Sequence, residues 1–259
     1  MSFARINGAV LHWQAHGAGP PVVFANSLGS DLRIWDALPL PGYRVVRYDL
    51  RGHGLSDAPK GAFGIDDHAD DLAALIDHLG AGPCALVGLS VGGMIVQRLA
   101  ARFPERARAI VLCATAARIG TPAMWAGRIE AVRHGGLAPI ADAILERWFT
   151  ARFRAERPDD LAGWRNMLVR TPAIAYAATC AAIRDADLAA GAAAIRAPCL
   201  CVAGAEDVST PPELVRATAA LITDARFETI AGAAHLPCIE QPDRLSALIR
   251  QHLTEAAYV

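Results

Sequence analysis

The sequence predicts a single α/β domain in which a mostly parallel sheet carries helices on both faces and a helical cap insertion interrupts the alternation. Three observations predict this class. Apolar, strand-like runs alternate with segments of helical periodicity along most of the 259 residues. Between residues 118 and 190 the alternation stops and only helical periodicity remains. The run ALVGLSVGGM, at 85–94, places Ser90 between glycines at the end of an apolar strand, which is typical of a sharp strand-to-helix turn.

The individual elements follow from their patterns. The Asn7-Gly8 pair joins two short alternating segments and predicts a hairpin with a tight turn. Strands are then predicted within PPVVFANSLG (20–29), YRVVRYDLRGHGLS (43–56), CALVGLS (84–90), ARAIVLCAT (107–115), APCLCVAGAED (197–207) and ARFETIAGAAH (225–235). Helical spacing of apolar residues predicts helices over 66–79, 91–102, 212–222 and 241–253. The first of these helices has acidic residues in its first turn, where they interact favourably with the helix dipole.

The break in the alternation divides the chain. Residues 1–117 and 191–259 are expected to form the sheet-based core, and residues 118–190 a helical insertion, which we call the cap. The cap contains three of the five tryptophans, Trp125, Trp148 and Trp164. Because it starts after one strand and ends before the next, we expect it to lie over the ends of the sheet strands.

Composition excludes several classes of function. The chain is 53% hydrophobic and 20% charged, which argues against disorder, and its net charge of −1 comes with no Lys/Arg-rich run. Nucleic acid and membranes are therefore not expected partners. The first residues lack the pattern of a signal peptide, and no apolar run is long enough to span a membrane, so a cytoplasmic protein is expected.

The six cysteines show no metal-ligand spacing, and reduced, buried thiols are expected. Cys199 and Cys201 form a C-x-C on a predicted strand, where we expect them to face opposite sides.

Ser90 suggests nucleophilic catalysis, because ligand sites of parallel sheets form beyond the carboxyl ends of the strands. A nucleophilic serine needs a histidine to take its proton and an acid to orient that histidine. Only His53 and His235 lie in loops just after a predicted strand. For the acid, the loop after 197–207 offers Glu206 and Asp207, of which we favour Asp207 because it is shorter and lies at the loop apex.

Such a site also needs donors for an oxyanion. The backbone N–H of Val91 is expected to serve, because it begins the helix after Ser90 and the helix dipole points the same way. The backbone N–H of Leu28, in the loop ANSLGSD after the first parallel strand, is the expected second donor.

At this point the chain resembles the α/β-hydrolase superfamily over nearly its whole length. The resemblance rests on NSLG (26–29), DLRGHGLS (49–56), GLSVGG (88–93), GAEDVSTPP (204–212) and GAAHLPCIEQP (232–242). It implies the α/β-hydrolase fold and a catalytic triad in the chain order Ser, Asp, His. That order selects His235 over His53, which precedes Ser90.

More narrowly, the chain resembles 3-oxoadipate enol-lactonases in NSLGSDLRIWD (26–36), AARIGTPAMW (116–125) and CAAIRDADL (180–188). The resemblance implies a small anionic enol-lactone substrate in the protocatechuate branch of aromatic degradation, with no cofactor and no metal. The substrate carboxylate should meet an arginine of the cap, which offers Arg118, Arg128, Arg133 and Arg147. Arg128 and Trp125 are the first candidates because they lie one helical turn apart, and Trp148 is a further candidate for the pocket wall.

Other functions stay open on the sequence alone. A general carboxylesterase or a cofactor-free perhydrolase shares the same triad and differs only in the shape of the pocket. A hydrolase of carbon–carbon bonds is a further alternative. From another class, a ligand receptor built on a hydrolase fold also retains these residues, and repeated turnover would distinguish an enzyme from it.

Overall fold

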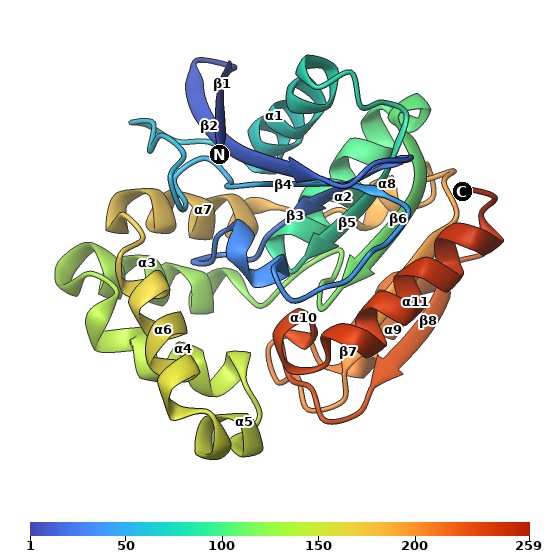
Figure 1. Ribbon diagram of the computed structural model, residues 1–259. Helices are drawn as coiled ribbons and strands as arrows, with labels where there is room; N and C mark the ends of the chain where they lie inside the picture. Colours follow the sequence, from blue (N-terminus) through green and yellow to red (C-terminus); the bar gives the residue numbers. More distant parts are fainter.

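The computed structural model describes residues 1–259 and contains one eight-stranded sheet in the order β1-β2-β4-β3-β5-β6-β7-β8 (Figure 1). The pairs β1–β2 and β2–β4 are antiparallel, and all other pairs are parallel. The strands are β1 (Ser2–Ile6), β2 (Ala9–His16), β3 (Pro21–Ala25), β4 (Arg44–Tyr48), β5 (Cys84–Leu89), β6 (Ala107–Cys113), β7 (Cys199–Gly204) and β8 (Arg226–Ile230). The sheet is therefore mostly parallel, with a hairpin at one edge, as the sequence predicts.

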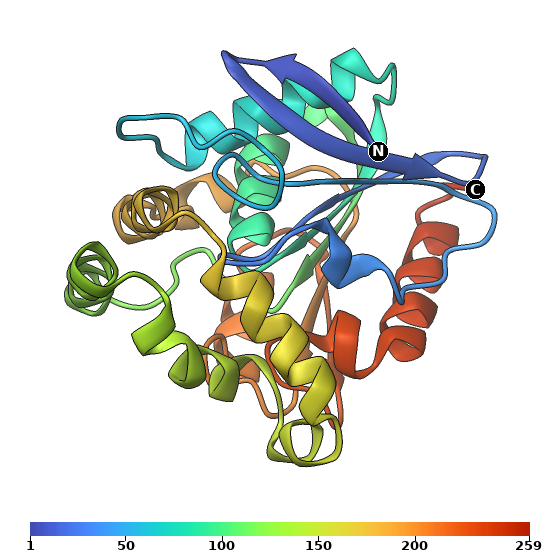
Figure 2. The same cartoon turned by 60° about the vertical axis from the view of Figure 1, so that its left-hand side comes forward.

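Helices cover both faces of this sheet. Figure 2 shows α1 and α2 on one side and α11 on the other. The helices outside the cap are η1 (Leu32–Trp35), α1 (Ile65–His78), α2 (Val91–Arg102), η2 (Pro104–Arg106), α9 (Pro212–Ala219), α10 (Pro237–Glu240) and α11 (Pro242–Glu255). The predicted helix 212–222 ends earlier, at Ala219, because the chain turns back toward β8 through Asp224, which has a φ of 56°.

Residues 118–190 contain helices and no strand. Their helices are α3 (Pro122–Gly135), η3 (Ala138–Ile140), α4 (Ala141–Trp148), α5 (Ala151–Glu156), α6 (Pro158–Val169) and α7 (Ala173–Asp185), and α8 (Ala189–Ala192) crosses the predicted boundary. In Figure 1, α3 to α6 gather below and to the left of the sheet. One continuous core of 85 buried residues includes both sheet and cap side chains, so the cap packs directly on the sheet domain. The division into core and cap as separate units stays a prediction.

The parallel register brings the carboxyl ends of the central strands to one edge of the sheet. Ala25 of β3 pairs with Gly88 of β5, which pairs with Leu112 of β6. The loops that follow β3, β5, β7 and β8 therefore start close together, although they lie far apart in the sequence.

All six cysteines are free and buried. The expectation for Cys199 and Cys201 is wrong, because their Sγ atoms lie 3.9 Å apart on β7. Side chains two residues apart on a strand point to the same face, so a C-x-C places its thiols side by side. No helix is long and apolar enough to cross a membrane.

Candidate active site

Ser90 occupies a strained turn between β5 and α2. Its backbone has a φ of 57° and a ψ of −119°, a conformation that L-residues rarely adopt. The turn is held on both sides: the Ser90 N–H donates to Cys113 O at 3.0 Å, and Thr115 Oγ1 donates to Ser90 O at 2.6 Å. The sheet therefore fixes the serine at the carboxyl end of β5 before any ligand binds.

The glycines around Ser90 are required by close packing of the backbone. A Cβ atom on Gly88 would collide with the backbone of Gly92, the second residue of α2. A Cβ atom on Gly92 would collide with the carbonyl of Ala25, at the end of β3. The G-x-S-x-G spacing thus lets α2 start directly against two neighbouring strands.

The two predicted oxyanion donors, the backbone N–H groups of Val91 and Leu28, belong to segments next to Ser90. Val91 is the first residue of α2, where N–H groups have no acceptor inside the helix. Leu28 follows β3, and its N–H donates no backbone hydrogen bond. The loop around Leu28 is rigid, because Asn26 Nδ2 donates to Ser30 O at 2.7 Å and Ser30 Oγ donates to Ser27 O at 2.8 Å.

Asp207 and His235 form a buried pair on the loops after β7 and β8. Their Oδ2 and Nδ1 atoms lie 2.8 Å apart, and the two residues are 2% and 4% exposed. Three further donors hold the carboxylate: Ser209 N at 2.7 Å and Thr210 N at 3.1 Å from Oδ1, and Thr210 Oγ1 at 2.7 Å from Oδ2. Glu206, the other acid of this loop, is exposed.

The environment keeps Asp207 ionised. Burial by itself raises the pKa of the Asp207 carboxyl, but the charge and hydrogen bond of His235 and the hydrogen bonds of Thr210 together lower it below its usual value. An ionised Asp207 accepts the Nδ1–H of His235, which leaves Nε2 as the ring nitrogen free to take a proton.

Ser90, His235 and Leu28 line one cavity of about 120 Å³. The cap contributes Trp125 and Trp148, two of the predicted pocket residues, to the lining of this cavity. The remaining lining residues include the apolar side chains Ile119, Met124, Ile144, Ile183 and Val208. The fold thus brings the predicted nucleophile, base and cap aromatics to a single small space.

The four cap arginines that the sequence offers separate into two groups. Arg128 and Arg147 line the cavity with Ser90. Arg118 is exposed and lies 3.4 Å from Asp187, and Arg133 faces a different cavity. The Arg128 guanidinium lies 5.1 Å from the ring centroid of Trp125, the one-turn relation expected from their spacing.

Beyond the apolar lining residues, sequence reasoning missed two further residues whose contacts shape the site. Tyr176, on α7, is 1% exposed and lines the same cavity. Its signal was its position one helical turn before Cys180 on the buried face of a periodic segment.

Glu240 is the second missed residue, because the sequence gives no sign of what it contacts. Its Oε2 accepts the N–H of Ala234 at 2.7 Å, and its Oε1 accepts the N–H and the hydroxyl of Thr150 at 3.0 and 2.7 Å. The Leu236 N–H also donates to Trp148 O at 3.2 Å. Three of these hydrogen bonds join the segment that carries His235 to the cap, and the fourth, from Ala234 to Glu240, lies within that segment.

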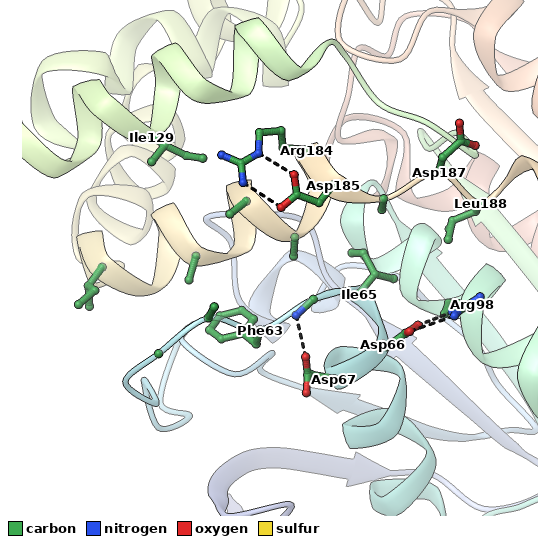
Figure 3. Close-up of a pocket in the computed structure, with 18 of the residues that line it drawn as sticks. Phe63, Ile65, Asp66, Asp67, Arg98, Ile129, Arg184, Asp185, Asp187 and Leu188 are labelled. Carbon is green, nitrogen blue, oxygen red and sulfur yellow. Dashed lines mark hydrogen bonds and ion pairs between the residues drawn. The ribbon is translucent and has the colours of Figure 1, made fainter.

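A larger cavity of about 1210 Å³ lies between α3, α7 and the start of α1 (Figure 3). It contains none of the predicted catalytic residues, and its charged side chains largely satisfy one another. Arg184 pairs with Asp185 at 2.7 Å, Arg98 pairs with Asp66, and Asp67 accepts the N–H of Gly64 at 2.7 Å. The smaller cavity at Ser90 is therefore the candidate active site.

No group of three or more His, Cys, Asp or Glu side chains is arranged to hold a metal ion. The absence of a cofactor stays a prediction.

Comparison with known proteins identifies relatives across almost the whole chain. Residues 20–242 match the family described as alpha/beta hydrolase fold. The chain is 36% identical to 3-oxoadipate enol-lactonase 2 of Acinetobacter baylyi over 86% of its own length and 84% of that protein.

Solved structures agree with this assignment. An enol-lactonase from Burkholderia xenovorans LB400 superposes with a TM-score of 0.95 at 38% identity, covering 98% of this chain and all (100%) of that one. A thermophilic esterase from Thermogutta terrifontis, solved with malate bound, gives a TM-score of 0.93 at 31% identity over 99% of both chains. With its sheet order, its strained serine turn and these relatives, the chain belongs to the alpha/beta hydrolase fold family and is a hydrolase.

Proposed function

We propose that the protein is a serine hydrolase that opens 3-oxoadipate enol-lactone to 3-oxoadipate, a step in the protocatechuate branch of aromatic degradation. The observation that carries this proposal is the composition of the small cavity. It combines Ser90, His235 and Leu28 with the cap residues Arg128 and Trp125. A nucleophile and a cation in one small cavity suit a small ester that carries its own carboxylate. The enol-lactonase relatives, at 36% and 38% identity, support the same substrate.

In the proposed reaction Ser90, His235 and Asp207 act as nucleophile, general base and orienting acid. Ser90 Oγ attacks the lactone carbonyl while His235 Nε2 accepts its proton and Asp207 holds the imidazole in the required tautomer. The N–H groups of Leu28 and Val91 donate hydrogen bonds to the oxyanion, and each such donor contributes about 3 kcal/mol of transition-state stabilisation.

Ring opening then follows from the nature of the leaving group. When the tetrahedral intermediate collapses, the ring C–O bond breaks and an enolate departs, takes a proton and tautomerises to a ketone. Ser90 now carries an acyl group with a free carboxylate at its far end. Water activated by His235 attacks this ester, releases the diacid and restores Ser90. No metal or cofactor is required at any step.

Arg128, beside Trp125, is the proposed partner of the substrate carboxylate, with Trp148 as part of the wall. A cytoplasmic location is part of the proposal, because six free, buried cysteines are typical of a reducing compartment.

A general esterase of small neutral esters is the second candidate. The apolar lining from Ile119, Ile144 and Ile183 favours it, as does the similarity to the thermophilic esterase. It differs from the first proposal in one respect, which is whether the cavity requires a negative charge on the substrate.

A steady-state assay of the wild type and Ser90→Ala on 3-oxoadipate enol-lactone, beside a neutral aryl ester, separates these functions. Efficient turnover of the lactone that is lost with Ser90 is the expected result. Good hydrolysis of the aryl ester with poor hydrolysis of the lactone would remove the proposed substrate and leave the esterase. Stoichiometric reaction without turnover would instead indicate a receptor.

A further inference from the structure

Tyr176, on α7, lines the cavity that contains Ser90. The residue is 1% exposed, yet it lines the cavity together with Arg128 and Arg147. A buried tyrosine that lines a cavity beside two arginines brings a large apolar ring and one hydroxyl that can form hydrogen bonds.

The ring of Tyr176 packs against the loop that carries Leu28. Gly29 has a φ of 76°, and a Cβ atom placed there would lie 2.9 Å from Cε2 of Tyr176 and 2.6 Å from Cδ1 of Leu168. The adjacent Thr171 Oγ1 donates to Gly29 O at 3.4 Å. The cap therefore holds the backbone immediately after Leu28, and Tyr176 is one of the side chains that contact it.

The hydroxyl of Tyr176 lies in a cationic environment. Burial and the Cys180 thiol raise the pKa of the phenol, whereas the nearby guanidinium groups of Arg128 and Arg147 lower it, and the net shift is upward. The hydroxyl therefore keeps its proton and can donate it in a hydrogen bond. With the two arginines it forms a group of donors in the cavity that contains Ser90, and such a group suits an anionic oxygen.

We propose that Tyr176 is a specificity-determining residue whose hydroxyl donates a hydrogen bond to the substrate carboxylate beside Arg128. This inference rests on the proposed function, since it assumes a substrate with a carboxylate. The ring fixes the distance between this donor and the oxyanion loop, because it contacts the Gly29 backbone directly. Tyr176 then positions the carboxylate relative to the scissile carbonyl, and esters without a carboxylate gain nothing from it.

The test compares Tyr176→Phe with the wild type on three substrates: the enol-lactone, an aryl hydrogen succinate, which is anionic, and an aryl butyrate, which is neutral. Tyr176→Phe keeps the ring against Gly29 and removes only the hydroxyl. We expect KM for both anionic substrates to rise about tenfold with kcat within about threefold, since a hydrogen bond to a charged group is lost. KM and kcat for the butyrate should not change.

Tyr48→Phe is the matched control, because Tyr48 is also 1% exposed and its hydroxyl has no partner and does not line the cavity. It should leave all three substrates unaffected. Tyr176→Leu tests the ring: because it removes the contact with Gly29, it should lower kcat for the neutral ester as well.

The outcomes are distinguishable from failure of the proposed function. If the wild type ignores the lactone but Tyr176→Phe still selectively weakens the succinate ester, the proposed substrate falls and the role of Tyr176 stands. Unchanged KM for the anionic substrates, or equal losses for anionic and neutral esters, would overturn the role of Tyr176 even if the lactone is a good substrate.

Discussion

The molecule contains two buried His–Asp pairs of nearly the same geometry. His235 Nδ1 lies 2.8 Å from Asp207 Oδ2, and His12 Nδ1 lies 2.7 Å from Asp49 Oδ2. In each pair both residues are almost completely buried, with His12 at 3% and Asp49 at 1% exposure. Distance and burial therefore do not distinguish the pair proposed for catalysis from the other.

The difference lies at the second ring nitrogen. His235 lines the cavity with Ser90, whereas Nε2 of His12 is buried without any partner, and its ring lies 5.2 Å from that of Phe3. The Asp49 carboxylate also accepts hydrogen bonds from the backbone N–H groups of Leu32 and Leu55, at 2.8 Å each. The His12 pair joins β2 to two loops, and only the His235 pair places its imidazole at a cavity that also contains Ser90.

Removing His235 should chiefly lower activity, whereas removing His12 should chiefly lower stability. His235→Ala should lower kcat about 10⁴-fold or more, since the serine loses its base, with little change in Tm. His12→Ala should leave kcat/KM within about threefold but lower the free energy of unfolding by about 2 kcal/mol, because a buried carboxylate loses a partner. Enzyme assays and thermal unfolding of both variants measure this. A folded but inactive His12→Ala protein would contradict the distinction.

Replacing each aspartate by asparagine should again lower activity at one pair and stability at the other, with a smaller difference between the two pairs than removing the histidines. Asp207→Asn should lower kcat by about 10³- to 10⁴-fold, because an amide no longer fixes the tautomer of His235. Asp49→Asn should chiefly lower stability, by about 1–3 kcal/mol, because its amide nitrogen cannot accept the hydrogen bonds that the carboxylate accepts. Denaturant titration beside steady-state kinetics tests both. Equal losses of kcat in the two variants would remove the contrast.

The His235 loop should depend on Glu240, for which the His12 pair has no equivalent. Glu240→Gln leaves only one accepting oxygen, so either the link to Ala234 or that to Thr150 is lost. We expect kcat/KM to fall about tenfold, equal to about 1.4 kcal/mol, with the protein still folded. Glu206→Gln, an exposed acid beside Asp207, is the control and should behave like the wild type. Wild-type kinetics in Glu240→Gln would show that the loop does not need the cap.

A buried histidine that, in contrast to the two paired histidines, has no carboxylate partner should make the free energy of unfolding depend on pH. Burial lowers the pKa of His68, helped by the charges of His53 and Arg51, and both of its ring nitrogens lack a partner. Below pH 6.5, the pKa of the histidine in the unfolded chain, His68 is protonated in the unfolded chain but stays neutral in the folded protein. The free energy of unfolding therefore decreases as the pH falls through 6.5.

Between about pH 7.5 and 5.5 this loss is about 1.4 kcal/mol for one such histidine. His68→Leu should remove it, leaving a flatter dependence of the unfolding free energy on pH. Denaturant titrations at the two pH values measure the change, and an unaltered slope would show that His68 does not carry this proton.

Local patterns were sufficient to predict most of the fold and to single out Ser90 and Asp207, whereas the choice of His235 over His53 also needed the resemblance to the α/β-hydrolase superfamily. The G-x-S-x-G spacing placed Ser90 at the end of β5, because only glycines fit where α2 starts against β3 and β5. The helices over 66–79 and 91–102 were predicted to within one residue, since their apolar positions repeat at the helical period. Asp207 was favoured over Glu206, and the structure places Asp207 against His235 and leaves Glu206 exposed.

The contacts of the cap could not be predicted in the same way. Trp125 and Arg128 were chosen from their spacing on one helix, a relation that the helix itself enforces. Tyr176 and Glu240 were missed because their partners lie more than 80 residues away in the sequence, at Gly29 and Thr150. A periodic pattern shows that such a side chain is buried and does not show what it is buried against.

The sequence by itself determined the sheet and the serine turn, because these depend on steric and periodic rules that act over a few positions, and the resemblance of its motifs to the α/β-hydrolase superfamily supplied the order of the three residues proposed for catalysis. Only the tertiary structure decided that Arg128 and Arg147 face Ser90 while Arg118 and Arg133 do not. It also decided that one His–Asp pair faces a cavity and the other is enclosed. The physical reason is that the contents of a cavity are set by how whole helices pack on the sheet, and that packing depends on contacts between segments distant in the sequence.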